Sequence, residues 1–250
     1  MRESDKITNP DFFEKLEHGI KQVARPESRI EIRGLSDSFY GTAEGLYWYS
    51  HPRATEELCI EAKRGEKEGY DAVIIGCVGA VEAEYVIKEA LSIPVVGVSE
   101  SGFLLATLLG TNFALITYTD KTYGWLYRTV RQYGLQDKCV SIRQANLGIS
   151  EILKKTEVAY ERTLEQAKLA VEEDRAEVIL LGSIGFAGLA DYVRKRIEAP
   201  VVDPLEAGVK FAEMMVDLHK AKGLLHSKVI TFKASPNIEK FLRLGKAKDN

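Results

Sequence analysis

One segment of the chain occurs twice, and this duplication constrains the fold more than any other feature. Residues 71–102 (DAVIIGCVGAVEAEYVIKEALSIPVVGVSESG) and residues 177–208 (EVILLGSIGFAGLADYVRKRIEAPVVDPLEAG) align without gaps at an offset of 106. The matched pairs include Gly76 with Gly182, Gly79 with Gly185, Pro94 with Pro200, Glu100 with Glu206 and Gly102 with Gly208. In the same register Cys77 aligns with Ser183, so the two copies differ at a position that can carry chemistry.

Along the whole chain, short apolar runs alternate with charged segments of helical periodicity. The predicted strands are Lys6–Thr8, Arg29–Arg33, Ala72–Gly76, Val95–Val98, Phe113–Tyr118, Cys139–Arg143, Val178–Gly182, Val201–Val202 and Lys228–Phe232. The predicted helices are Asp11–Ala24, Thr55–Glu68, Glu82–Leu91, Gly102–Leu109, Thr122–Tyr133, Ser150–Glu173, Ala187–Ile197 and Leu205–Lys220. This alternation predicts an α/β fold with mostly parallel sheets. With the duplication, it predicts two similar lobes, one of residues 1–105 plus 215–250 and the other of residues 106–214.

The composition argues against several classes of protein. The net charge is −3 and basic residues are interleaved with acidic ones, so no surface for nucleic acid is expected. The longest apolar runs are too short to span a bilayer, and the N-terminus (MRESDKITNP) lacks the apolar region of a secretory signal. The three cysteines and the scattered histidines lack metal-ligand spacing. We therefore expect a cytoplasmic protein with free thiols and without a metal or nucleotide cofactor.

The glycine turns after the two repeated strands are the candidate reactive positions. In open α/β sheets, ligands bind beyond the carboxyl ends of the strands, and residues 76–79 (GCVG) and 182–185 (GSIG) lie there. Backbone amides at the start of a helix can bind a carboxylate or an enolate oxygen. The candidate amides are those of Val78, Gly79, Ile184 and Gly185.

Cys77 and Ser183 differ in what they can do at these turns. Cys77 is a candidate base, nucleophile or proton donor, because a helix N-terminus can lower the pKa of a thiol. The alternative is that Cys77 is a small buried apolar residue, the commonest state of a free cysteine. Ser183 cannot act as a base without an activating partner. It either hydrogen-bonds a ligand oxygen or only fits the turn.

An ordered series of segments resembles the aspartate/glutamate/hydantoin racemase superfamily, especially its hydantoin and allantoin racemase branch. The segments are VIIGCVGA, IPVVGVSESG, FALITYTDKTYGWLYRTVRQYGLQDKCVSIRQ, VILLGSIGFAGLADYV and APVVDPLEAGVKFAEMMV. The resemblance implies two pseudosymmetric lobes, an active site in the cleft between them and chemistry without a cofactor. It implies that one cysteine removes a proton from an acidified carbon of a hydantoin-like or amino-acid-derived substrate, and that a second cysteine returns a proton to the opposite face. Cys77 takes the first position and Ser183 the second.

The serine at the second position leaves other functions open. Proton delivery by a serine should be slow, because each unit of pKa mismatch costs about 1.4 kcal/mol. The alternatives from the same superfamily are a single-thiol decarboxylase, in which one cysteine protonates an enediolate, and a cis–trans isomerase, in which the first cysteine acts as a nucleophile. A catalytically silent homologue that binds a small molecule is a further alternative.

Three other residues are candidate contacts for a carbonyl or carboxylate substrate. Asn9 follows the first predicted strand, where an ordinary turn residue is equally expected. Thr117 and Tyr118 end a later strand. The next residues, Thr119 and Asp120, are expected mainly to cap the helix that follows.

The roles of three further features are predicted less directly. Glu100 and Glu206 occupy equivalent positions where helices begin, which favours a structural role over general acid chemistry. The aromatic segment Phe39–Tyr49 fits either a loop over the cleft or simple packing. The long helical segment Glu151–Glu173 is compatible with a homo-oligomer and equally with an exposed face.

Overall fold

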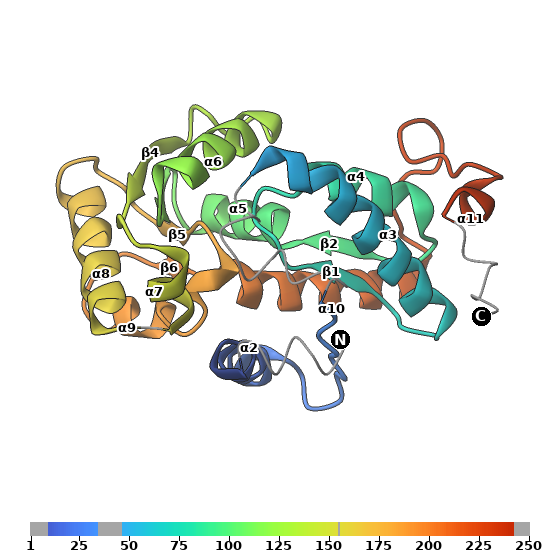
Figure 1. The fold of residues 1–250 in the computed structure, drawn as a ribbon, viewed down its shortest axis with the longest axis horizontal. Helices are drawn as coiled ribbons and strands as arrows, with labels where there is room; N and C mark the ends of the chain where they lie inside the picture. Colours follow the sequence, from blue (N-terminus) through green and yellow to red (C-terminus); the bar gives the residue numbers. More distant parts are fainter. Residues whose placement is uncertain (1–9, 35–46, 155, 243–250) are drawn as a thin grey trace.

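The computed structural model describes residues 10–34, 47–154 and 156–242, and its strands form two parallel sheets. The first sheet has the order β1-β2 and the second the order β4-β3-β5-β6. The strands are β1 (Val73–Ile75), β2 (Val95–Gly97), β3 (Phe113–Thr117), β4 (Cys139–Gln144), β5 (Ile179–Leu181) and β6 (Val201–Val202). All the pairings in these two sheets are parallel, which confirms the predicted α/β class. Figure 1 shows the two sheets in different halves of the molecule, here called the first and second lobes.

Helices cover both sheets. They are α2 (Pro10–Val23), α3 (His51–Lys67), α4 (Val81–Ala90), α5 (Val98–Leu109), α6 (Asp120–Gln132), α7 (Ile149–Lys154), α8 (Glu157–Glu172), α9 (Ala190–Arg194), α10 (Pro204–Lys222) and α11 (Ile238–Phe241), with short 3-10 helices η3 (Trp48–Ser50) and η4 (Ile184–Phe186). Helices α3 and α4 pack together beside the first sheet, and α8 and α9 pack beside the second (Figure 1). Among the helices in the described ranges, none is both long and apolar enough to cross a membrane.

Strand β3 shows why the second sheet is buried on both faces. Its residues are apolar along almost its whole length, and each is buried. Ala114 and Ile116 pack in the cluster that includes alanines of α8. Phe113 and Leu115 point the other way, into the cluster with Phe103 of α5 and residues of α6. The alternation of side chains along a strand therefore places helices on both sides, as the continuous apolar run predicts.

The helix that ends each repeat crosses to the opposite lobe. Helix α5 follows β2 but packs against β5 and β6, and α10 follows β6 but packs against β1 and β2. The two helices also pack on each other. The repeated glycines make room: a Cβ at Gly102 would lie 3.1 Å from Leu180 Cδ1, and one at Gly208 would lie 3.0 Å from Val98 Cγ1. The duplication therefore builds the packing between the lobes as well as each lobe.

Two predicted helices differ from the structure. The segment Ser150–Glu173 is not one helix, because the backbone leaves the helical conformation at Thr156, whose side chain accepts a hydrogen bond from the Ala159 amide and caps α8. The predicted helix Ala187–Ile197 shortens to α9, since Gly188 adopts a left-handed conformation with φ +82° just before it. Both breaks depend on a single residue within an otherwise helical pattern.

Two predicted strands are wrong, and a third lies outside the described residues. Arg29–Arg33 forms no strand, although Ile32 packs against the apolar cluster around α2. Lys228–Phe232 forms turns, in which the Lys228 ammonium donates to carbonyls at the end of α4. The apolar residues of these segments are largely exposed, with Val229 79% and Ile230 82% exposed, so the pattern predicts neither burial nor strand pairing here. Lys6–Thr8 is the predicted strand outside the described residues.

Candidate functional site

The turns that follow β1 and β5 approach each other across the two lobes. A methyl group placed on Gly76 would lie 3.6 Å from Ile184 Cδ1. Helix α6 of the second lobe also packs against the turn after β1, since a Cβ at Gly79 would lie 3.8 Å from Trp125 Cβ. Gly79 has φ +97°, a conformation that favours glycine. The turn that carries Cys77 is therefore fitted against the second lobe.

The surroundings of Cys77 favour the protonated form of its thiol. The residue is half-buried, and the protein around its thiol raises the pKa to about 11. Burial is the larger cause, and the negative charge of Glu84 is the second. Helix α4 begins at Val81, four residues after Cys77. Burial and the charge of Glu84 act against the lowering of the pKa considered from the sequence, and a thiolate with a raised pKa is more basic.

Ser183 and Tyr118 meet on the second lobe. Tyr118 directly follows β3 and is 8% exposed. Burial raises the pKa of its hydroxyl to about 12, the charge of the Cys77 thiolate raises it further, and a hydrogen bond with Ser183 lowers it. The Tyr118 ring packs edge-on against Phe186, with ring centroids 6.0 Å apart. These interactions bring Cys77, Tyr118 and Ser183 into one region, although they come from three different turns.

The four candidate amides fall into two groups. The Gly79 amide donates to Ser99 Oγ at 3.1 Å, and the Gly185 amide donates to Ser183 Oγ at 3.0 Å. Both glycines are buried, and their amides already have acceptors within the protein. Val78 and Ile184, which precede them at equivalent positions, are half-buried. The accessible part of each turn is therefore the residue that directly follows Cys77 or Ser183.

Of the predicted substrate contacts Thr117 and Asn9, the structure describes only Thr117. Thr117 is fully buried, and its hydroxyl donates to Thr122 Oγ1 at 2.7 Å. Thr119 forms a capping box with Thr122 at the start of α6, as expected for a cap. Thr117 thus has a structural partner within the same turn. Asn9 lies outside the described residues.

Glu100 and Glu206 form the same ion pair in the two lobes. Glu100 pairs with Lys88 at 2.6 Å, and Glu206 pairs with Arg194 at 2.6 Å. Lys88 and Arg194 are themselves matched by the offset of 106. Each pair joins the helix after the glycine turn to the helix after the Pro-Val-Val strand. This confirms the structural role predicted for both glutamates.

Of the aromatic segment Phe39–Tyr49, the structure describes Tyr47–Tyr49. Trp48 packs with its ring centroid 5.6 Å from that of Trp125, and His51 packs 4.6 Å from the same ring. Because Trp125 also contacts the turn at Gly79, this aromatic cluster lies beside the turn that carries Cys77. Residues 39–46, which were predicted to form either a loop over the cleft or simple packing, lie outside the described residues.

Glu84 is a buried acid near the turn of Cys77 that the sequence pattern indicates only as part of a helix. It is 1% exposed, and its charge influences the pKa of Cys77. A signal was present in the duplication, since Glu84 aligns with Ala190. An acid in one copy where the other has a small apolar residue indicates a position that the fold does not require to be charged.

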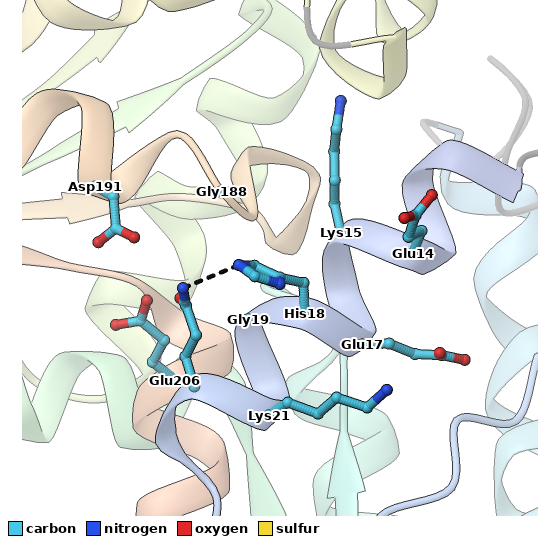
Figure 2. Close-up of a pocket in the computed structure, with 10 residues that line it drawn as sticks. Glu14, Lys15, Glu17, His18, Gly19, Lys21, Gly188, Asp191 and Glu206 are labelled. Carbon is cyan, nitrogen blue, oxygen red and sulfur yellow. Dashed lines mark hydrogen bonds between the residues drawn. The ribbon is translucent and has the colours of Figure 1, made fainter.

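A polar groove of about 610 Å³ lies between α2 and the second lobe. Figure 2 shows His18 on α2, with Asp191 and Glu206 on the opposite side. The residues that line it do not include Cys77 or Ser183, so it is distinct from the meeting of the two turns. Within the described part of the chain, no group of three His, Cys, Asp or Glu side chains is placed to hold a metal ion.

Comparisons with known proteins agree on one family. The model of the family Asp/Glu/Hydantoin racemase matches residues 6–212. The hydantoin racemase of Pseudomonas sp. (strain NS671) is 34% identical over 229 residues, which is 91% of this chain and 90% of that protein. The crystal structure of allantoin racemase from Pseudomonas fluorescens is similar, with a TM-score of 0.77 at 29% identity over 92% of this chain and 94% of that one. Arylmalonate decarboxylase shares the fold, with a TM-score of 0.58 at 18% identity over 80% of this chain and 86% of that one.

Proposed function

The chain belongs to the Asp/Glu/hydantoin racemase family, and we propose that it is a cofactor-independent racemase for a hydantoin-like or amino-acid-derived substrate. The class of enzyme, an isomerase of the racemase type, follows from its hydantoin and allantoin racemase relatives. The proposal adds the substrate and the groups that move the proton. The observation that supports it most is the approach of the turns that carry Cys77 and Ser183, since a Cβ at Gly76 would lie 3.6 Å from Ile184 Cδ1.

Cys77 is the proposed base and proton donor on one face of the substrate. Its raised pKa makes the thiolate scarce at neutral pH but strongly basic. A basic group is suited to a carbon acid, whose proton is only weakly acidic, since proton transfer is most efficient when the two pKa values are similar. Cys77 is half-buried as a residue, at the turn that faces the second lobe.

The second face is assigned to Ser183 together with Tyr118. Ser183 alone is a poor acid–base group. Its hydrogen bond with Tyr118 connects it to a hydroxyl that is more acidic than that of a serine. The proposed oxyanion contacts fall to the amides of Val78 and Ile184, because those of Gly79 and Gly185 already donate to serine hydroxyls. The division of the chain at residues 105 and 214 and the cleft between the lobes remain part of the proposal.

The second candidate function is chemistry on one face only, such as decarboxylation or cis–trans isomerisation. Ser183 favours it, because the second lobe contributes a hydroxyl where a second thiol would make proton return fast. In decarboxylation Cys77 alone would deliver the proton, and the product would keep one configuration. In cis–trans isomerisation the Cys77 thiolate would instead add to the double bond and leave again after rotation about the resulting single bond.

One experiment separates these functions. Single enantiomers of 5-substituted hydantoins are incubated with the protein in deuterated water, and both optical rotation and deuterium incorporation are followed. We expect deuterium exchange with loss of optical rotation. Exchange with retention would favour the one-face function. An absence of exchange across a broad panel of carbon acids that still bind would overturn the enzyme in favour of a silent binding protein.

We also propose that the protein acts in the cytoplasm on a small molecule, as the free state of its three cysteines suggests. Whether it assembles into a homo-oligomer stays a prediction. Sedimentation of the purified protein would test the second point, and fractionation of cells would test the first.

A further inference from the structure

Glu84 is a buried acid with half of its carboxylate unsatisfied. It lies in the first turns of α4, directly after the turn that carries Cys77, and is 1% exposed. Its Oε2 accepts a hydrogen bond from the Tyr133 hydroxyl. Its Oε1 is buried and has no hydrogen-bond partner among the described residues. Burying such an oxygen costs free energy, so the position is not explained by stability.

The backbone places this carboxylate at the end of the sheet from which Cys77 emerges. Gly97 is the last residue of β2 and pairs in register with Ile75 of β1, two residues before Cys77. A Cβ at Gly97 would overlap the Glu84 carboxylate, so only glycine leaves space for it. The acid therefore fills the carboxyl end of the first sheet, beside the reactive turn.

The charged groups around Glu84 act on its ionisation in opposite directions. Lys88 is one turn further along α4, but its ammonium is 2.6 Å from Glu100 of α5. Glu100 is itself an acid, and Tyr133 at the end of α6 is neutral and its pKa is raised by burial. Burial is the main cause that raises the pKa of Glu84 to about 7, opposed by the hydrogen bond from Tyr133 and the charge of Lys88. Cys77 faces the same region from the turn after β1.

The second lobe shows that the fold does not need this arrangement. The residues aligned with Glu84 and Gly97 are Ala190 and Asp203. Asp203 is also buried, but its carboxylate accepts from the Leu205 amide at 2.8 Å and caps α10. The acid in the second lobe is thus satisfied by the backbone, whereas Oε1 of Glu84 has no hydrogen-bond partner among the described residues.

We propose that Glu84 is a positioning residue that controls the ionisation of Cys77: its neutral form permits the thiolate, and its carboxylate opposes it. The proposal builds on the proposed function, since it assigns the control of the group that would move the proton. Glu84 does not replace the missing second base, because it lies in the same lobe as Cys77. It acts through Cys77.

The test measures the thiol directly and needs no substrate. The protein is alkylated with iodoacetamide from about pH 6 to about pH 10, and the peptide that contains Cys77 is quantified by mass spectrometry. Glu84→Gln should raise the alkylation rate of Cys77 at about pH 8 to 9 between roughly three- and tenfold, because a tenfold change in thiolate corresponds to one pKa unit. Glu84→Asp, which keeps the charge, should stay near the wild-type profile.

Two controls make the outcome decisive. Glu82→Gln changes an exposed acid on the same helix, which pairs with Arg128, and should leave the profile unchanged. Glu84→Ala, which copies Ala190, serves if the glutamine variant folds poorly. An alkylation profile of Cys77 that is the same in wild type, Glu84→Gln and Glu84→Ala would overturn the proposal. A shifted profile in a protein that exchanges no substrate proton would instead overturn the proposed function and leave the role of Glu84 standing.

Discussion

The two repeats use the same scaffold but place their polar groups differently. The ion pairs Lys88–Glu100 and Arg194–Glu206 are equivalent in sequence and in geometry. The buried acids at the ends of the two sheets are not equivalent. In the first lobe the acid is Glu84 of α4, and in the second lobe it is Asp203, which directly follows β6. What both repeats share is therefore the connection between elements, and what differs is the chemistry of the turn.

The acceptor for the glycine amide differs in the same way. In the first lobe, Gly79 donates to Ser99 because a thiol at position 77 is a weak acceptor. In the second lobe, Gly185 donates to Ser183, and the residue aligned with Ser99 is the apolar Leu205. In each turn the amide of the second glycine donates to one serine hydroxyl, which is that of Ser99 in the first lobe and that of Ser183 in the second. In the first lobe Cys77 therefore accepts no hydrogen bond from the Gly79 amide, whereas in the second lobe Ser183 accepts one from the Gly185 amide.

The largest expected effect comes from removing the thiol that distinguishes the first lobe. Cys77→Ala should lower deuterium exchange by roughly 10²- to 10⁴-fold, the usual contribution of a general acid–base group. Melting temperature and circular dichroism should show an intact fold. Cys139→Ala is the matched control, since Cys139 is also half-buried with its pKa raised to about 12. Equal exchange in wild type and Cys77→Ala would remove Cys77 from the mechanism.

Ser183→Cys should make the two turns chemically alike. A thiol is far more acidic than a serine hydroxyl, so we expect the rate of loss of optical rotation, relative to deuterium exchange, to rise about tenfold or more. The lost acceptor for the Gly185 amide should cost about 1 kcal/mol of stability. Ser183→Ala removes the hydroxyl without adding a thiol, and it should not gain racemisation. The same ratio in both variants would show that the second turn does not face the substrate.

Gly97→Ala tests the steric difference between the lobes. The new Cβ would overlap the Glu84 carboxylate, so the free energy of unfolding in urea should fall by about 1–3 kcal/mol. Combined with Glu84→Ala, the same substitution should cost much less, and the two changes should couple by roughly 0.5–3 kcal/mol. Gly124→Ala, where a Cβ meets no atom within 4 Å, is the control and should be neutral or slightly stabilising. Additive effects would contradict the overlap.

The pH dependence of stability should differ between wild type and Glu84→Gln. The folded protein holds the pKa of Glu84 at about 7, above its ordinary value of 4.5, so the proton is bound more tightly in the folded state. This contribution is fully present below about pH 4.5 and is lost as the pH rises through about 7. Relative to Glu84→Gln, the wild type should lose about 3 kcal/mol over that window. Urea unfolding at several pH values measures the difference, and parallel curves would show that the pKa of Glu84 is not raised.

The smallest effects are expected at the matched ion pairs. Glu100→Gln should cost about 1–2 kcal/mol, because it leaves the Lys88 ammonium, whose side chain is 8% exposed, without its partner. Glu206→Gln should cost less than about 1 kcal/mol, since Arg194 is 33% exposed and keeps its bond to Asp191. Unfolding at low and high salt checks both, and a larger loss at Glu206 would reverse this ranking of the lobes.

The sequence by itself determined the features that depend on local pattern and on the repeat. Apolar strand runs predicted parallel sheets, the offset of 106 located both turns, and Thr119 was predicted as a cap. The matched glutamates predicted a structural role that the ion pairs confirm. Family membership also followed from motifs in order along the chain, and the match to residues 6–212 confirms it.

Only the tertiary structure decided what surrounds each reactive group. The strand predictions at Arg29–Arg33 and Lys228–Phe232 failed because these segments stay largely at the surface and pair with no strand of the described residues. The surroundings of Cys77 combine burial with the charge of Glu84, whose carboxylate lies against Gly97 and accepts a hydrogen bond from Tyr133 at the end of another helix. Desolvation and charge act through space between segments that are distant in sequence. For that reason the position of the thiol could be predicted from the chain, whereas its pKa could not.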